Sequence, residues 1–77
     1  MYTVYAIRSE IDGRVYVGFT ADIDRRFKEH NAGKNPSTKG YLPWRLIYKE
    51  EQETRLAARA REKYLKSGVG KEFLKSL

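Results

Sequence analysis

Tyr5 and Tyr16 are the first candidates for functional residues, because of their phenol side chains and their positions in the sequence. They lie on either side of an Asp12-Gly13 turn, in segments rich in residues that favour strands. Pairing across this turn places both phenols on one face of a hairpin, where a simple packing pair is the common outcome. Gly18 favours a functional interpretation, because a glycine inside a strand weakens it unless a backbone or a ligand must approach closely.

A second candidate pair follows in the next segment. Arg26 and His30 are four residues apart, so on a helix they stack on one side, beside the apolar stripe of Ile23 and Phe27. A snorkelling arginine next to a hydrogen-bonded histidine explains this placement without any function. An anion clamp is the alternative, because the planar guanidinium matches two phosphate oxygens.

Glu62 is the acidic residue of an otherwise cationic stretch. A helical ion pair with Arg59 or Lys66 would account for it, at roughly a few tenths of a kcal/mol. A lone carboxylate is also a ligand for one hard cation, which takes oxygen ligands and water. Glu62 is therefore a candidate metal ligand.

Basic residues around these candidates suit contacts with a phosphate backbone, which position nucleic acid without reading its bases. Residues 34–43 form a polar, turn-forming run that is either a flexible connection or a phosphate-contacting loop. The candidates for backbone contacts are Lys34, Lys39, Arg59 and Lys63.

Composition limits the class of protein. The chain has 77 residues, 40% of them hydrophobic and 34% charged, and a net charge of +6. We expect one small domain over residues 1–77, with either a solubilising basic surface or a polyanionic partner. The absence of cysteine excludes disulfides and cysteine-ligated zinc. No apolar run approaches a membrane span and no basic secretory region begins the sequence, so we expect a cytoplasmic protein without a membrane partner.

The pattern of apolar residues predicts the elements that position the candidates. We expect strands over residues 2–8, 14–20 and 44–49, and helices over residues 22–31, 53–66 and 70–76. The order β-β-α-β-α-α predicts an α+β fold, a small three-stranded and mainly antiparallel sheet flanked by helices.

Local signals refine these elements. Thr20 or Asp22 is expected to cap the first helix, and Gly33 to end it in a left-handed conformation. In the third strand, Leu46 and Tyr48 are predicted to share a face. The predicted core stripe of the second helix is Leu56, Ala57, Ala60 and Tyr64.

Together these residues resemble the GIY-YIG nuclease superfamily, over the length of a whole catalytic domain. Val4-Tyr5-Ala6 falls at the first motif of the family, and Tyr16-Val17-Gly18 at the second. The following helix has Arg26 at the family's arginine position and His30 at a histidine position found in many members.

The segment Arg61-Glu62-Lys63 resembles the one that carries the family's metal-binding glutamate. The chain looks like the small stand-alone members, which are related to the nuclease domain of the bacterial excision-repair endonuclease. Two departures are visible: Val4 and Ala6 differ from the residues that give the first motif its name, and no asparagine follows Glu62 as in some repair-type members.

The resemblance implies a divalent-metal-dependent endonuclease that hydrolyses phosphodiester bonds in DNA, selecting structure rather than sequence, in repair or recombination. It implies one Mg²⁺ or Mn²⁺ ion held by Glu62, and a scissile phosphate clamped by Arg26. Tyr5 or Tyr16 would be the general base or position the water, while His30 would bond a tyrosine or relay a proton. No small-molecule cofactor is expected. The alternative is a nucleic-acid-binding module with the same fold and little or no activity.

Overall fold

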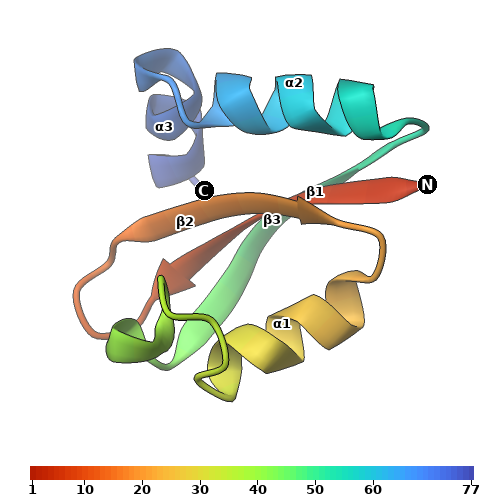
Figure 1. Ribbon diagram of the computed structural model, residues 1–77. Helices are drawn as coiled ribbons and strands as arrows, with labels where there is room; N and C mark the ends of the chain where they lie inside the picture. Colours follow the sequence, from red (N-terminus) through yellow and green to blue (C-terminus); the bar gives the residue numbers. More distant parts are fainter.

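The computed structural model describes residues 1–77 and has the predicted element order. The elements are β1 Tyr2–Ser9, β2 Val15–Thr20, α1 Ile23–Asn31, a short 3-10 helix Lys39–Tyr41, β3 Trp44–Gln52, α2 Arg55–Leu65 and α3 Gly68–Lys75. The three strands form one antiparallel sheet in the order β2-β1-β3. Figure 1 shows α1 on one side of this sheet and α2 and α3 on the other. The predicted α+β fold is confirmed.

β1 is the central strand because both of its faces are apolar. Val4 and Ala6 face the α2–α3 layer, whereas Tyr5 and Ile7 face the α1 layer, and all four are buried. This alternation follows from the two-residue period of a strand. Tyr5 therefore points towards the helix that carries the predicted arginine and histidine.

Capping interactions fix α1 at both ends. The side chain of Asp22, rather than Thr20, caps the helix, and its Oδ1 accepts a hydrogen bond from the backbone N of Arg25 at 3.1 Å. The predicted left-handed glycine after the helix is confirmed, since Gly33 has φ 75°. At the same end, the Asn31 side chain accepts from the backbone N of Trp44 at 2.7 Å and donates to its carbonyl at 3.1 Å.

The predicted core stripe of α2 is wrong. Leu56 and Tyr64 are 80% and 47% exposed, whereas Ala58 and Leu65 are fully buried. The buried residues are two turns apart, so the helix presents a different face to the sheet from the predicted one. Arg61 helps to set this rotation, because it makes a bidentate ion pair with Glu50 of β3.

The predicted shared face of Leu46 and Tyr48 is also wrong. Tyr48 pairs with Ala6 and Leu46 with Ile7, so Ile47 is an extra residue in β3 and forms a bulge. Leu46 consequently packs in the α1 layer, while Ile47 and Tyr48 both pack in the α2–α3 layer.

None of the helices has the length and apolar character that a membrane span requires.

Candidate active site

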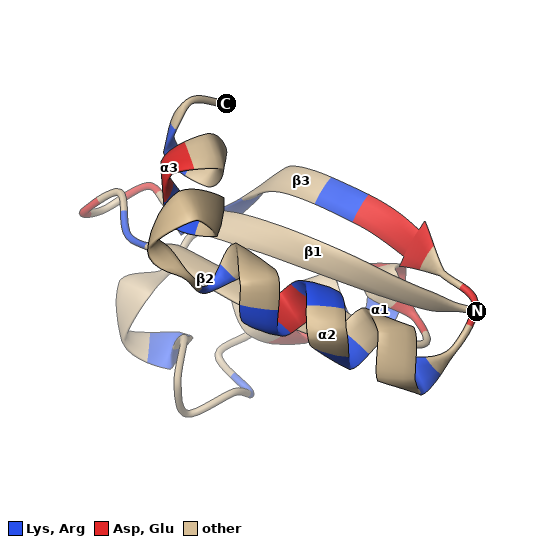
Figure 2. Ribbon diagram, turned by 90° about the horizontal axis from the view of Figure 1, so that it is seen from above, with Lys and Arg blue, Asp and Glu red and all other residues tan.

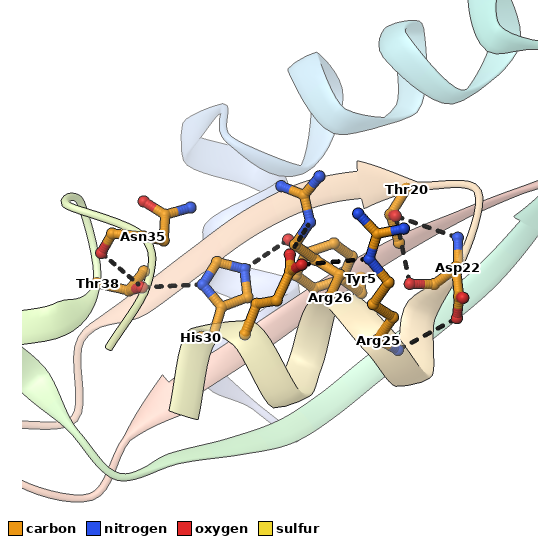
Figure 3. Close-up of polar contacts among 9 residues, drawn as sticks. Tyr5, Thr20, Asp22, Arg25, Arg26, His30, Asn35 and Thr38 are labelled. Atoms are coloured by element: carbon orange, nitrogen blue, oxygen red, sulfur yellow. Dashed lines mark hydrogen bonds and ion pairs between the residues drawn. The ribbon is translucent and has the colours of Figure 1, made fainter. Parts of the chain in front are cut away.

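Tyr5 lies in a buried chain of hydrogen bonds that joins β1, α1 and the loop after α1 (Figure 3). Its hydroxyl oxygen is 2.8 Å from Nε2 of His30, and Nδ1 of His30 is 2.9 Å from Oγ1 of Thr38. Tyr5 is 1% exposed, and His30 and Thr38 are 0% exposed. The Thr38 hydroxyl donates to the backbone carbonyl of Asn35 at 3.4 Å.

This chain assigns the protons on the histidine. The Thr38 hydroxyl has one hydrogen, which it donates to Asn35, so it accepts from Nδ1–H of His30. A neutral His30 then has a free lone pair on Nε2, and the Tyr5 hydroxyl donates to it. Tyr5 is thus a hydrogen-bond donor whose proton points at His30.

Electrostatics keeps both of these groups uncharged. Burial raises the pKa of Tyr5, and the nearby Tyr16 raises it further, while Arg26 acts in the opposite direction. Burial also lowers the pKa of His30, and the positive charge of Arg26 adds to that effect. At neutral pH, Tyr5 is therefore protonated and His30 is neutral.

Tyr16 shares the face of Tyr5, as predicted, but is only half-buried. Its ring centroid is 6.4 Å from that of Tyr5 and 5.1 Å from that of His30. Gly18 pairs with Tyr5 across the β1–β2 ladder, and a Cβ atom built on it would lie 2.8 Å from the Tyr5 hydroxyl and 3.3 Å from Cε1 of Tyr16. Only glycine therefore leaves room for the two phenols as they stand.

Arg26 extends from α1 and remains half-exposed. Its Nε is 3.4 Å from Oε1 of Glu29, a long ion pair at the surface that contributes little stability. Arg26 borders two surface depressions. One, of about 250 Å³, extends towards Lys34 and residues 35–36 of the loop. The other, of about 260 Å³, lies at the end of β2 and is also lined by Arg25 and Arg55.

Glu62 approaches the site from α2, on the other layer. Its side chain is 23% exposed, and its carboxylate is 3.6 Å from Nζ of Lys66. Glu62 is close enough for its negative charge to raise the pKa of Tyr5. The structure therefore brings Tyr5, Tyr16 and His30 into direct contact. Arg26 lies one turn before His30 on α1, whereas Glu62 has Lys66 as its side-chain partner and contacts none of the other four residues.

A metal ion at Glu62 would have few protein ligands. No group of three or more histidine, cysteine, aspartate or glutamate side chains is placed to hold an ion. A single carboxylate does not fit zinc, which is usually held by three or four protein ligands. It fits Mg²⁺ or a similar hard ion, which keeps several waters and is commonly bound through one or two carboxylates.

An ion pair between Arg61 and Glu50 holds α2, the helix that carries Glu62, against the sheet. Arg61 donates from Nε and Nη2 to the carboxylate of Glu50 on β3 at 2.8 and 2.9 Å, and the Tyr48 hydroxyl donates to the same group at 2.6 Å. These bonds, chiefly those from Arg61, lower the pKa of Glu50 to about 2. Because Arg61 precedes Glu62, this pair restrains the direction of the candidate metal ligand.

The four predicted backbone-contact residues are all exposed, and only Lys34 lines a depression together with Arg26.

Two residues of the site were not predicted from the sequence. Thr38 lies in a loop with no periodicity, and only the need of a buried histidine for a second partner points to it. Glu50 is one of several acidic residues in its segment, and nothing in the spacing distinguishes it as the partner of Arg61.

The sheet, the tyrosine pair and the flanking helices have the arrangement of a known family, as comparison with known proteins shows. The model of the GIY-YIG catalytic domain matches residues 1–74. The chain belongs to the GIY-YIG nuclease superfamily.

Small relatives in this superfamily are similar over most of the chain. A UPF0213 protein of Haloquadratum walsbyi is 44% identical over 57 residues, which cover 73% of this chain and 64% of that protein. The solution NMR structure of a UPF0213 protein from Bacillus halodurans has 36% identity and a TM-score of 0.59, and the match covers 99% of this chain and 84% of that one.

A larger relative carries a functional name. The structure-specific endonuclease subunit SLX1 of Homo sapiens is 37% identical over 51 residues, which cover 61% of this chain and 18% of that protein. The chain thus spans less than two thirds of the H. walsbyi relative and about a fifth of the human one.

Proposed function

We propose that residues 1–77 form one domain that acts as a divalent-metal-dependent endonuclease on DNA. The observation that supports this most strongly is the buried Tyr5–His30 pair, which has Tyr16 and Arg26 beside it and Glu62 within electrostatic range. Hydrolysis of a phosphodiester needs an activated water, a group that stabilises charge on the phosphoryl oxygens and a metal or acid for the leaving oxygen. The five residues supply candidates for each.

Tyr16 is the tyrosine that we assign to the attacking water. The Tyr5 hydroxyl is buried, donates its proton to His30 and has a raised pKa, so it is a poor base. Tyr16 is half-buried and packs on the edge of the His30 ring, which leaves it the more accessible phenol. Tyr5 and His30 then act as its support, holding the Tyr16 ring in one position.

Arg26 and Glu62 complete the proposed mechanism. The guanidinium of Arg26 binds the scissile phosphate and stabilises the charge that develops on it. Glu62 would hold one Mg²⁺ or Mn²⁺ ion, which would supply a Lewis acid for the phosphoryl group. Lys34, Lys39, Arg59 and Lys63 contact neighbouring phosphates and do not read bases.

The contacts available to the substrate favour recognition of DNA structure rather than sequence, since the candidate residues are cations and not base-reading side chains. The name of the human relative, a structure-specific endonuclease subunit, supports the same preference and a role in repair or recombination. A binding module with little or no activity is the second candidate, because Glu62 has few partners that would help it to hold a metal.

Cleavage of labelled supercoiled, branched and single-stranded DNA with Mg²⁺, Mn²⁺ or EDTA tests the proposal. The unaltered protein is expected to cut at least one substrate in a metal-dependent way. Glu62→Gln and Arg26→Ala are expected to reduce cutting at least about 100-fold, in line with the loss of one charge-stabilising group. Glu53→Gln and Arg45→Ala, which change exposed residues elsewhere, serve as controls of equal charge.

Two outcomes would overturn the endonuclease proposal. DNA binding that persists in EDTA, with no cleavage under either metal, would favour the binding module. Full activity of both Glu62→Gln and Arg26→Ala would show that the reaction is carried out elsewhere on the domain.

A further inference from the structure

We propose that a second cationic depression, at the hairpin end of β2, binds a backbone phosphate of the nucleic acid several nucleotides away from the cleaved bond. We call it the turn notch. It has a volume of about 240 Å³ and is lined by Gly13, Arg14, Val15, Lys71 and Lys75. This proposal rests on the proposed function only in taking nucleic acid as the ligand.

Two contacts order the side chain of Arg14. Its guanidinium carbon lies 3.6 Å from the centroid of the Tyr41 ring, and its Nε donates to Asp12 at 2.8 Å. The bond to Asp12 uses Nε, and the guanidinium lies against Tyr41, so the positive charge of Arg14 is held at the hairpin end of β2. Stacking and the Asp12 contact thus remove part of the entropy cost of ordering this side chain.

The lysines come from the other side of the notch. Lys71 and Lys75 are four residues apart on α3, so they lie on one side of that helix, and both are exposed without an ion-pair partner. A hydrogen bond from Nη2 of Arg8 to the carbonyl of Leu74, at 3.4 Å, joins α3 to the hairpin. The notch is therefore lined by one arginine of the hairpin and two lysines of α3, and none of its lining residues is acidic.

The position of the notch relates it to the candidate active site. β2 is an edge strand whose first residue, Val15, lines the turn notch. Its last residues, Phe19 and Thr20, line the depression that contains Arg26. Figure 1 shows β2 running from the hairpin beneath α3 to the start of α1. Tyr16 and Gly18 lie between the two depressions.

The separation suits a nucleic acid. A strand of six residues spans about 20 Å, which is about six nucleotide steps along the axis of a duplex at ~3.4 Å each. A backbone that follows the β2 edge from Arg26 would therefore reach the turn notch within one turn of duplex. The notch recognises phosphate charge, so it would add affinity and orientation without sequence preference.

The charges of the other sheet edge favour the β2 side. β3 carries Glu50 and Glu51, the acidic stretch seen in Figure 2 on the edge away from β2. Its cations, Arg45 and Lys49, are exposed but line none of the depressions found on the surface. These two residues provide a matched control, because replacing them removes the same charge from the β3 edge, which we do not expect to contact the nucleic acid.

The test compares Lys71→Ala/Lys75→Ala with Arg45→Ala/Lys49→Ala in the full chain. Binding to a fluorescent 16-base-pair duplex is measured by anisotropy in EDTA at several salt concentrations, so that no cutting occurs. We expect the notch variant to bind about 5- to 30-fold more weakly, and its salt dependence to fall by about one phosphate contact, a slope change of ~0.9. The control should change both quantities by less than half as much. Lys71→Gln/Lys75→Gln, with long polar side chains, should behave like the alanine variant if charge is the cause.

Shortening the duplex supplies a second readout. The difference between the unaltered protein and the notch variant should disappear once the duplex no longer spans β2. An unchanged affinity and salt slope in the notch variants, or an equal loss in the control, would overturn the inference. Binding through the turn notch without cleavage of any substrate would support this inference and refute the proposed function.

Discussion

Gly18→Ala is predicted to disturb the candidate active site through a single added methyl group. That atom would lie 2.8 Å from the hydroxyl oxygen and 3.0 Å from Cζ of Tyr5, whereas ordinary contacts begin near 3.4 Å. The Tyr5 ring is rigid and 1% exposed, and its hydroxyl is bound to the fully buried His30, so it has no free volume to enter.

The magnitude follows from this geometry. Relief of the contact requires a shift of about 0.6 Å, which lengthens the 2.8 Å bond from Tyr5 to His30. Overpacking of a tight core costs about 1–3 kcal/mol, while the lower chain entropy of alanine returns about 0.5–1 kcal/mol. We expect a net loss of about 1–2 kcal/mol, or a fall in Tm of roughly 4–16 °C for a domain of this size. Displacement of the tyrosines should also reduce cleavage by about 10- to 100-fold.

Urea unfolding and metal-dependent cleavage measure the two effects. Gly40→Ala is the matched control, because nothing lies within 4 Å of its added methyl group and its φ is not positive. Adding Tyr5→Phe to Gly18→Ala removes the closest atom, so the double variant should be less destabilised than the sum of the single ones by more than about 0.5 kcal/mol. Equal stability and activity of Gly18→Ala and Gly40→Ala would refute the reasoning.

Three further predictions concern the groups that support the site. Thr38→Val removes the partner of the buried Nδ1 of His30 and should lower the free energy of unfolding by about 1–3 kcal/mol in urea titrations; no loss would contradict the hydrogen bond between these two side chains. Because Arg61 holds the pKa of Glu50 at about 2, below its usual value of 4.5, the stability from this pair is present above pH 4.5 and is lost as the pH falls towards 2. Glu50→Gln should therefore flatten that part of the stability profile, by about 1–2 kcal/mol after screening at the half-exposed Arg61. Burial lowers the pKa of His30, so protonation opposes folding, and stability should decline as the pH drops below 6.5; His30→Gln should abolish this decline, as monitored by circular dichroism.

The residues that share a short helix or a tight turn were predicted well from the sequence. Arg26 and His30 lie where a four-residue spacing places them, and the Asp22 cap and the Gly33 stop fix the helix that carries them. The facing of Tyr5 and Tyr16 likewise follows from the Asp12-Gly13 turn, because a hairpin sets its own register.

Features that depend on contacts between distant segments were predicted poorly. The apolar residues of α2 are three alanines, two leucines and Tyr64, and they are spread around the helix, so the apolar pattern allows more than one buried face. The ion pair of Arg61 with Glu50 and the small side chain of Ala58 favour the observed one. The bulge at Ile47 depends on the partner strand in the same way, and it reverses the faces of Leu46 and Tyr48. Thr38 belongs to the site but lies in a loop whose sequence has no periodic pattern, so it could not be predicted.

The central place of β1 has a consequence for how the molecule reaches its native state. β1 is synthesised before the rest of the sheet, yet its register with β3 pairs Tyr2 with Gln52. Until that later strand and the covering helices emerge, Val4 to Ile7, which are among the most buried residues of the native domain, remain exposed to water. Pairing over such a separation is slow compared with hairpin formation. The docking of β3 is thus expected to limit the rate of refolding, and the bare β1–β2 hairpin is the species most exposed to aggregation.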